Sequence, residues 1–314
     1  MPSFDSINYS LRPSKCIQRH IVFEGARRLQ ANLDWENIVY IGLGSIWFTD
    51  FTMAHKVLGI DSMVSIEAND IGFHRAVFNA PYATVKVKQG YTSEILPELY
   101  VDPEVSARPW LVWLDYDGAF EETCAGDIRS VIENAPANTA LLVTVNAHEM
   151  SYGRVPERVE RLRDIFGAIV PDEMPKRACR DGRMQETLAD LVLDFMQSIA
   201  SDIARPGGFI PAFRVIYQDS APMVTVGGLL PSKGSARIVR DIVTGGDWIG
   251  KPSKPIVAPN LTLKEAATLQ AKLPRPDKLS RALIRELGFD LEEEQIEAFQ
   301  MYYRQYPAFA QILP

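Results

Sequence analysis

Short apolar runs alternate with amphipathic segments through the first half of the chain, and this alternation constrains the fold more than any other feature. Runs such as IVYIG and WLVWL carry no charge, as expected for strands that are buried on both faces of a sheet. The segments between the runs place apolar residues at helical spacing. Five expected strands lie at residues 36–42, 62–68, 84–90, 109–117 and 139–147. Strands joined by helices predict an α/β, doubly wound fold with a mostly parallel sheet.

The pattern changes in the second half, where FIPAFRVIYQ and APMVTVGGLL are separated only by Asp219 and Ser220. Two apolar runs so close together predict an antiparallel hairpin that completes a seven-stranded sheet. We expect four regions: a helical N-terminal extension (1–35), the α/β domain (36–231), a linker rich in Gly, Pro, Lys and Ser (232–260) and a helical C-terminal appendage (261–314). Asn260 or Thr262 is expected to cap the first helix of the appendage, and Asp290 the last.

Charge and cysteine content narrow the class of protein. The net charge of −7 over 314 residues argues against the broad basic surface of a general duplex-binding protein, although a local basic groove remains open. Three distant cysteines without a CxxC pair argue against a disulfide framework and suit a reducing compartment. The chain begins without an apolar signal core and contains no run of about 18 apolar residues. We therefore expect a cytoplasmic protein that does not enter a membrane.

The first expected strand runs into a glycine turn, IVYIGLGSIWFTDF. Gly42 and Gly44 let the backbone turn tightly and allow a ligand to approach closely. A tight strand-to-helix turn without a ligand is an equally good explanation of this feature alone. The third glycine of a dinucleotide loop would fall on Trp47, which removes the close helix approach that seats a pyrophosphate.

An acidic residue ends the second expected strand, and it favours a ligand-binding turn over a turn without a ligand. Glu67 lies about twenty residues beyond the glycine turn, the spacing at which a carboxylate binds a ribose diol. The alternative is a solvated glutamate at a strand end. NAD and S-adenosylmethionine both fit a glycine turn followed by an acid. The missing third glycine and the late hairpin favour S-adenosylmethionine, which has no phosphate.

Residues 36–230 together resemble the class I S-adenosylmethionine-dependent methyltransferases, which have a Rossmann-like fold. The family's first loop reads (D/E)xGxGxG, and Tyr40 and Ile46 here replace its acid and its last glycine. The resemblance implies S-adenosylmethionine as cofactor, Glu67 as the ribose-binding acid, and an adenine contact in the segment KVKQGYTSEILPEL. The implied cofactor-binding residues are Tyr40, Gly42, Gly44, Ser45, Glu67, Gly90, Tyr91, Thr92 and Asp115.

Carboxylates follow the fourth expected strand in the sequence WLDYDG. Strand alternation places Asp115 and Asp117 on one side and Tyr116 on the other, at the edge where open α/β sheets bind ligands. One carboxylate is expected to face the cofactor and the other to orient a substrate. They are also compatible with capping the next helix or with holding a divalent metal, although the sequence predicts no metal site.

Two further segments supply candidate residues. His148, in VNAHE after the fifth strand, is a candidate general base, against the alternative of a surface histidine without a catalytic role. Tyr9, Arg12 and Lys15 precede the first strand, where many methyltransferases place part of the acceptor lid. They are candidates for recognising an anionic substrate, against the alternative of a solvated basic helix face.

The sequence therefore predicts a methyltransferase, O-directed, that acts on a small-molecule acceptor. A non-catalytic or regulatory protein that keeps the cofactor site is one alternative, because the glycine motif is altered. A nucleic-acid methyltransferase that uses the basic N-terminal helix is a second, and a dehydrogenase a third. The tyrosines of MYYRQYPAF, near the end of the chain, suit packing on the main domain or the seam of a homodimer.

Overall fold

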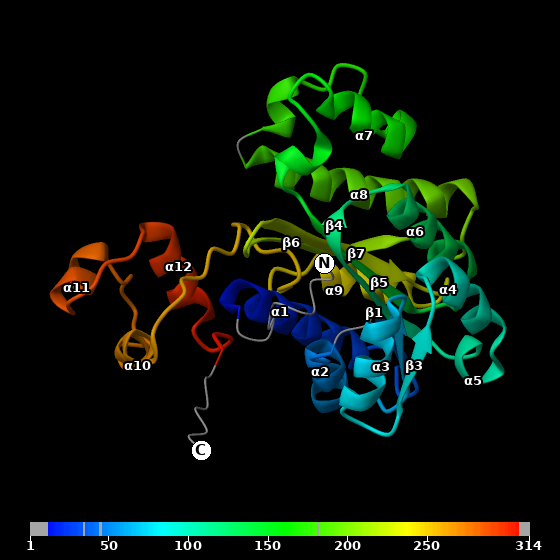
Figure 1. The fold of residues 1–314 in the computed structure, drawn as a ribbon, viewed down its shortest axis with the longest axis horizontal. Helices are drawn as coiled ribbons and strands as arrows, with labels where there is room; N and C mark the ends of the chain where they lie inside the picture. Colours follow the sequence, from blue (N-terminus) through cyan, green and yellow to red (C-terminus); the bar gives the residue numbers. More distant parts are fainter. Residues whose placement is uncertain (1–11, 34, 44–45, 181, 308–314) are drawn as a thin grey trace.

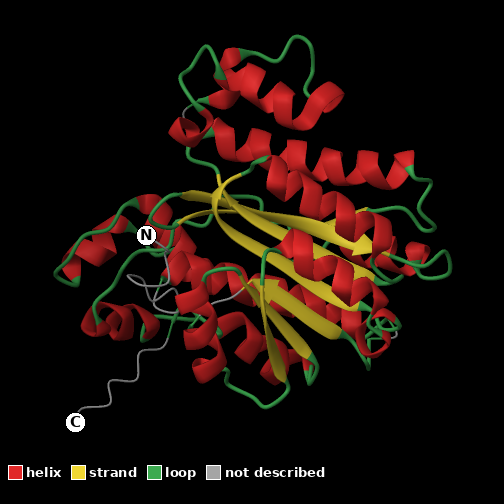
Figure 2. Cartoon of the chain, turned by 45° about the vertical axis from the view of Figure 1, so that its right-hand side comes forward, coloured by secondary structure: helices red, strands yellow, loops and turns green. Residues whose placement is uncertain are grey.

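The computed structural model describes residues 12–33, 35–43, 46–180 and 182–307. Its strands form one sheet in the order β3-β2-β1-β4-β5-β7-β6 (Figures 1 and 2). Strands β1 to β5 are parallel to one another, and β7 lies antiparallel between β5 and β6. The strands are β1 (Val39–Leu43), β2 (Met63–Glu67), β3 (Val85–Gln89), β4 (Trp110–Ala119), β5 (Thr139–Asn146), β6 (Ile210–Gln218) and β7 (Pro222–Leu230). The predicted α/β sheet and its terminal hairpin are confirmed.

Helices cover both faces of the sheet, because its strands are apolar on both sides. Along β4, Trp113 packs into one core and Leu114 into the other. The first core lies under α1 (Pro13–Gln30), α2 (Thr49–Leu58), α3 (Asp70–Asn79) and α9 (Ala236–Val243). The second lies under α4 (Thr92–Val101), α5 (Pro103–Ser106), α6 (Glu122–Asn134) and α8 (Arg183–Asp202). No helix in the described part of the chain combines the length and apolarity needed to cross a bilayer.

Gly42 has a packing reason of its own at the end of β1. A Cβ atom there would lie 3.1 Å from the Tyr40 ring and 3.2 Å from the Phe51 ring. The two rings pack edge to face with centroids 4.8 Å apart. The absent side chain thus makes room for the aromatic contact that holds α2 against β1, whether or not a ligand binds.

The segment between β5 and α8 forms a cap above the sheet, at the top of Figure 1. The cap, residues 147–180, contains η3 (Glu149–Tyr152), α7 (Arg158–Phe166), η4 (Gly167–Ile169) and η5 (Lys176–Cys179). Arg158 is its buried anchor: the guanidinium donates to a Glu149 carboxylate oxygen at 2.8 Å and to the carbonyls of Cys179 and Gly153 at 2.8 and 2.9 Å. One side chain thereby ties both ends of the cap together.

The segment 232–260, predicted as a linker, is packed onto the sheet. Val239 and Val243 of α9 are buried in the first core, and the Trp248 indole donates to the Ala212 carbonyl at 2.6 Å. Ile256 then pairs in parallel with Tyr217 of β6. Its Gly- and Pro-rich composition therefore hides several apolar anchor residues.

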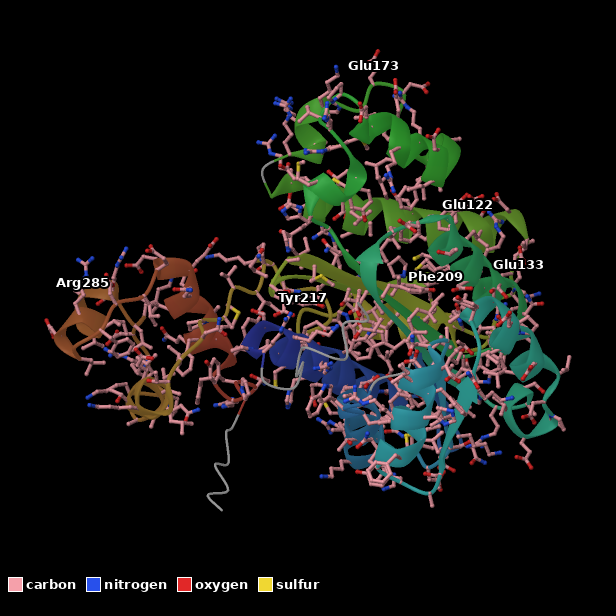
Figure 3. All side chains as sticks on the ribbon, in the orientation of Figure 1. Glu122, Glu133, Glu173, Phe209, Tyr217 and Arg285 are labelled. Atoms are coloured by element: carbon pink, nitrogen blue, oxygen red, sulfur yellow. The ribbon has the colours of Figure 1, made fainter. Side chains whose placement is uncertain are left out.

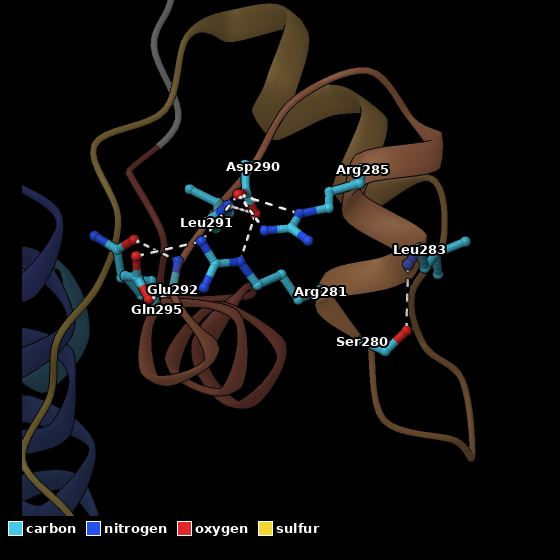
Figure 4. Close-up of polar contacts among 8 residues, drawn as sticks. All are labelled: Ser280, Arg281, Leu283, Arg285, Asp290, Leu291, Glu292 and Gln295. Carbon is cyan, nitrogen blue, oxygen red and sulfur yellow. Dashed lines mark hydrogen bonds and ion pairs between the residues drawn. The ribbon is translucent and has the colours of Figure 1, made fainter.

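The C-terminal appendage has a small core of its own and lies beside α1 (Figure 1). It contains α10 (Leu263–Gln270), α11 (Arg281–Glu286) and α12 (Glu293–Tyr302). Thr262 caps α10, as predicted. Asp290 does not cap α12, because its carboxylate pairs with Arg281 and Arg285, and Glu292 takes the cap position instead (Figure 4). These guanidinium hydrogen bonds hold the pKa of Asp290 below its usual range.

The packing of β7 predicts opposite outcomes for two glycine substitutions. In Gly227→Ala the new Cβ would lie 2.0 Å from the Leu141 carbonyl oxygen, so β5 and β7 must separate. We expect a loss of about 2 kcal/mol in the free energy of unfolding, measured by urea denaturation. Gly126→Ala, inside α6 with open space around it, should gain about 0.5–1 kcal/mol. Equal effects of the two changes would contradict this account of the sheet.

Candidate functional site

The carboxyl ends of the parallel strands gather most of the predicted site residues at one edge of the sheet. Glu67 ends β2, Asp115 lies on β4 where its regular pairing with β5 ends, and His148 follows β5. The Gly90 amide donates to the Glu67 carbonyl at 3.1 Å, which joins the ends of β2 and β3. Tyr9, Gly44 and Ser45 lie outside the described residues. The edge thus has a β2–β3 half with Glu67 and a β4–β5 half with Asp115.

The Glu67 carboxylate is held in place at the end of β2. Its Oε1 accepts a hydrogen bond from the Asn69 amide at 2.8 Å, and the group lies over Gly72 of α3. A Cβ atom at Gly72 would come within 2.8 Å of the Glu67 carboxyl carbon. Burial raises the pKa of this half-buried carboxyl, against the opposing effect of the Asn69 amide.

The residues after β3 differ in what they offer a ligand. Tyr91 is 67% exposed, so its ring is free to meet a planar group. The Thr92 hydroxyl is already used, since it donates to the carboxylate of Asp127 on α6. The Tyr116 hydroxyl donates to the same carboxylate at 2.6 Å, from the side of β4 opposite Asp115. Thr92 therefore fixes α4 to α6, and Gly90 and Tyr91 form the accessible part of this turn.

The strongest polar contact at the edge joins α1 to β4. The Lys15 ammonium donates to both carboxylate oxygens of Asp115, at 2.6 and 2.7 Å, and lies 3.3 Å from the Tyr217 hydroxyl. Figure 3 shows Tyr217 beside α1. Burial disfavours the Lys15 ammonium, but Asp115 and Tyr217 together more than offset this effect, so the pKa of Lys15 rises. Lys15 is therefore a cation at neutral pH, and only 5% of its side chain is exposed.

A carboxylate that the sequence analysis missed lies where the family motif lacks its acid. The Tyr40 hydroxyl donates to Asp50 of α2 at 2.5 Å, so a carboxylate lies at the end of the tyrosine side chain that stands at the acidic position of the motif. Burial raises the pKa of Asp50, and the nearby Arg19 guanidinium opposes this rise. The only sequence signal for Asp50 was its place in the helix after the glycine turn.

These groups form one cluster, which we call the buried charge cluster: Lys15, Arg19, Tyr40, Asp50, Asp115 and Tyr217. Arg19 lies one helical turn after Lys15 and is 6% exposed. Hydrogen bonds join Lys15 to Asp115 and Tyr217, and Tyr40 to Asp50. The Asp115 charge raises the pKa values of both Tyr40 and Asp50, after the larger effect of burial. The cluster combines two cations with two carboxylates. Within the described ranges, no three His, Cys, Asp or Glu side chains gather as metal ligands.

Three predicted residues have other surroundings. Arg12 is paired with Asp219 at 2.7 Å and donates to the Ser220 hydroxyl at 2.8 Å, at the turn of the β6–β7 hairpin. Asp117 is exposed beyond the cluster. His148 is exposed and caps η3, because its Nδ1 accepts from the Met150 amide at 3.3 Å.

Comparisons with known proteins agree with this geometry. A family model described as "Putative O-methyltransferase" matches residues 7–314. No curated protein sequence matches the chain.

Solved structures are similar to this chain at low sequence identity. Trm1 from Pyrococcus horikoshii, solved with S-adenosyl-L-methionine, has 12% identity and a TM-score of 0.50 over 76% of this chain and 61% of that one. This chain therefore spans about 61% of the length of Trm1. The Methanococcus jannaschii fibrillarin pre-rRNA processing protein has 11% identity and a TM-score of 0.39 over 63% of this chain and 68% of that one.

The Lys15–Asp115 ion pair leads to a stability prediction. Lys15→Met removes the cation and leaves Asp115 near the low-dielectric interior, so we expect a loss of about 2–3 kcal/mol in the free energy of unfolding. In the double variant Lys15→Met/Asp115→Leu no charge is left unpaired, and most of that loss should be recovered. Urea denaturation of the native protein, Lys15→Met, Asp115→Leu and the double variant measures the coupling. Additive losses would contradict a direct ion pair.

Proposed function

We propose a function that starts from family membership: this chain belongs to the O-methyltransferase family whose model matches residues 7–314. The chain transfers the methyl group of S-adenosylmethionine to an oxygen atom of a small-molecule acceptor. One observation carries the proposal: the Glu67 carboxylate, at the end of β2, and the buried charge cluster, which includes Asp115 of β4, lie toward the same edge of the sheet with β1 between these two strands. That edge is where open α/β sheets bind their ligands.

The adenosine end of the cofactor belongs to the β2–β3 half of the edge. Glu67 accepts hydrogen bonds from the two ribose hydroxyls, and its contact with the Asn69 amide already orients it. The exposed Tyr91 ring stacks on the adenine, next to the Gly90 backbone. The turn with Gly42, Gly44 and Ser45 passes beneath the sulfonium, where small residues permit a close approach.

The methionyl end of the cofactor is a zwitterion, and the buried charge cluster offers both signs of charge. Asp50 binds the α-ammonium group, held by the Tyr40 hydroxyl at 2.5 Å. Arg19 binds the α-carboxylate from α1. The Tyr40 side chain reaches from β1 to α2, where its hydroxyl holds Asp50. Asp50 thus supplies the negative charge that an acid at the position of Tyr40 supplies in the motif.

The Lys15–Asp115 pair activates the acceptor hydroxyl. The acceptor oxygen attacks the methyl carbon in line with the sulfur, so that the C–O bond forms as the C–S bond breaks and S-adenosylhomocysteine leaves. The hydroxyl proton passes to the Asp115 carboxylate. Lys15 is a cation at neutral pH, so it acts as a donor that stabilises negative charge on the oxygen and not as the base. His148 is exposed and caps η3, and this favours Asp115 over His148 as the base.

The surroundings of α1 also support a small acceptor over nucleic acid. Lys15 and Arg19 of α1 are buried, and Arg12, just before α1, is paired with Asp219, so these residues do not offer a free basic surface. A reducing compartment, the cytoplasm, suits the free cysteines Cys16, Cys124 and Cys179.

Calorimetric titration with S-adenosylmethionine tests the proposal. Glu67→Ala removes both acceptors for the ribose and should weaken binding about 10–100-fold, since hydrogen bonds to a charged group contribute about 1.5–3 kcal/mol. Glu67→Gln keeps one acceptor oxygen and should lie between this variant and the native protein. Glu104→Ala, an exposed carboxylate paired with Lys86, is the matched control and should leave the affinity unchanged. Absence of binding to the native protein would refute the proposed function.

A second titration tests the assignment of Asp50. Asp50→Asn keeps an acceptor for the Tyr40 hydroxyl but removes the charge that faces the ammonium. The variant should bind S-adenosylmethionine at least about tenfold more weakly, yet bind 5′-methylthioadenosine, which lacks the amino-acid end, as the native protein does. Equal losses for both ligands would place Asp50 outside the methionyl site.

A further inference from the structure

The cations expected to recognise an anionic acceptor are already neutralised. Arg12 pairs with Asp219 at 2.7 Å, and Lys15 pairs with Asp115 at 2.6 Å. Neither offers a free positive charge to a phosphate or carboxylate in this structure. An anionic acceptor would therefore need another source of cations near the edge of the sheet.

A second set of cations lies on the cap and at its junction with α8. We call it the basic segment: Lys176, Arg177, Arg180 and Arg183. All four residues are exposed, and none has an ion pair with an acidic side chain in the described part of the chain. Three other arginines of the cap have partners, since Arg158 is paired with Glu149, Arg161 with Glu121, and Arg163 donates to the carbonyls of Pro171 and Asp172, whereas Arg154 is exposed like the basic segment. The basic segment is thus a local excess of free positive charge.

Contacts on both sides hold the basic segment at the edge of the sheet. The Cys179 carbonyl accepts from the buried Arg158, whose partner Glu149 lies just after β5. The Gln185 amide donates to the carbonyls of Tyr217 and Met223 in the β6–β7 hairpin, at 3.2 and 3.4 Å. In Figure 3 the lower part of the cap lies between the labelled residues Glu173 and Tyr217. The basic segment therefore lies between the end of β5 and β6, the strand whose Tyr217 hydroxyl contacts the Lys15 ammonium.

The two halves of the edge assign this position to the acceptor. Glu67 and Tyr91 place the adenosine at the ends of β2 and β3, so the acceptor approaches from the ends of β4 and β5. We propose that the basic segment binds an anionic group, a phosphate or a carboxylate, of the small-molecule acceptor. This inference rests on the proposed function and adds the chemical class of the substrate.

Physical chemistry favours this role over a solvated surface. Guanidinium groups bind phosphate and carboxylate through paired hydrogen bonds, and three of the four residues are arginines. The chain carries a net charge of −7, so a local positive segment steers an anion toward this edge and not toward the rest of the surface. The eight residues 176–183 carry four cations and one acid, Asp181, a net charge of +3 that suits one or two anionic groups and is too small to track a nucleic-acid backbone.

Titration of the full chain with inorganic pyrophosphate and with citrate, at low salt, tests the proposal. Alanine replaces all four residues in the variant Lys176→Ala/Arg177→Ala/Arg180→Ala/Arg183→Ala. At least one probe should bind the native protein at least about tenfold more tightly than this variant, and the stronger probe tells phosphate from carboxylate. The control variant Lys56→Ala/Lys233→Ala/Arg240→Ala/Lys272→Ala removes four exposed cations elsewhere and should bind as the native protein does. Equal affinity of the native protein and the first variant for both probes overturns the proposal.

Methyl transfer distinguishes a failure of this inference from a failure of the proposed function. The native protein is incubated with methyl-tritiated S-adenosylmethionine and, separately, a small-metabolite extract or total RNA. A labelled small product that binds an anion exchanger, formed at least about tenfold more slowly by the first variant at unchanged cofactor affinity, supports the inference. A neutral or cationic product, or labelled RNA, overturns the inference while leaving methyl transfer intact. Absence of cofactor binding refutes the proposed function itself.

Discussion

The ion pair between Lys15 and Asp115 is the contact on which the arrangement of the site depends. It joins a helix that precedes the sheet to a central strand, and each partner is costly to bury alone. Because the pair fixes the axial position of α1, it also sets where Arg19 reaches the cluster. Tyr217 approaches the same ammonium from β6, so the far edge of the sheet is tied to its centre through one nitrogen atom. One side of the site is therefore formed by α1, a helix that precedes the alternating strands and helices.

The fold was predictable where local pattern and tertiary burial agree. Runs such as WLVWL are apolar because both faces of a parallel strand are covered, and this requirement is visible in the sequence itself. The segment 232–260 was read as a linker because it is rich in Gly, Pro, Lys and Ser. Its ordering depends on Trp248 packing on Phe213 and Ile256 pairing with Tyr217, which are partners far away in the sequence. Such pairings have no local signature.

The candidate site also has residues that the local sequence predicts and contacts that it does not. Glu67 and Asp115 were found because an acidic residue after an apolar strand lies at the ligand-binding edge wherever the strand lies in the sheet. The partners of Lys15 and Arg12 could not be found, since each ion pair spans at least a hundred residues of the chain. Tyr40 looked like the loss of an acid because sequence comparison aligns positions and not atoms. The ring carries a hydroxyl to Asp50, so the charge is displaced along the side chain and not removed.

Charge balance gives the cluster a consequence for turnover under the proposed function. S-adenosylmethionine carries one more positive charge than S-adenosylhomocysteine, and this charge lies on the sulfonium. An unpaired Asp115 would attract that charge strongly and favour the cofactor over the product. Lys15 neutralises the same carboxylate, so the pair weakens this preference while it keeps a donor for the acceptor oxygen. The cationic cofactor is then held mainly by Glu67 and Asp50 at its two ends, and the centre of the site stays available for the acceptor.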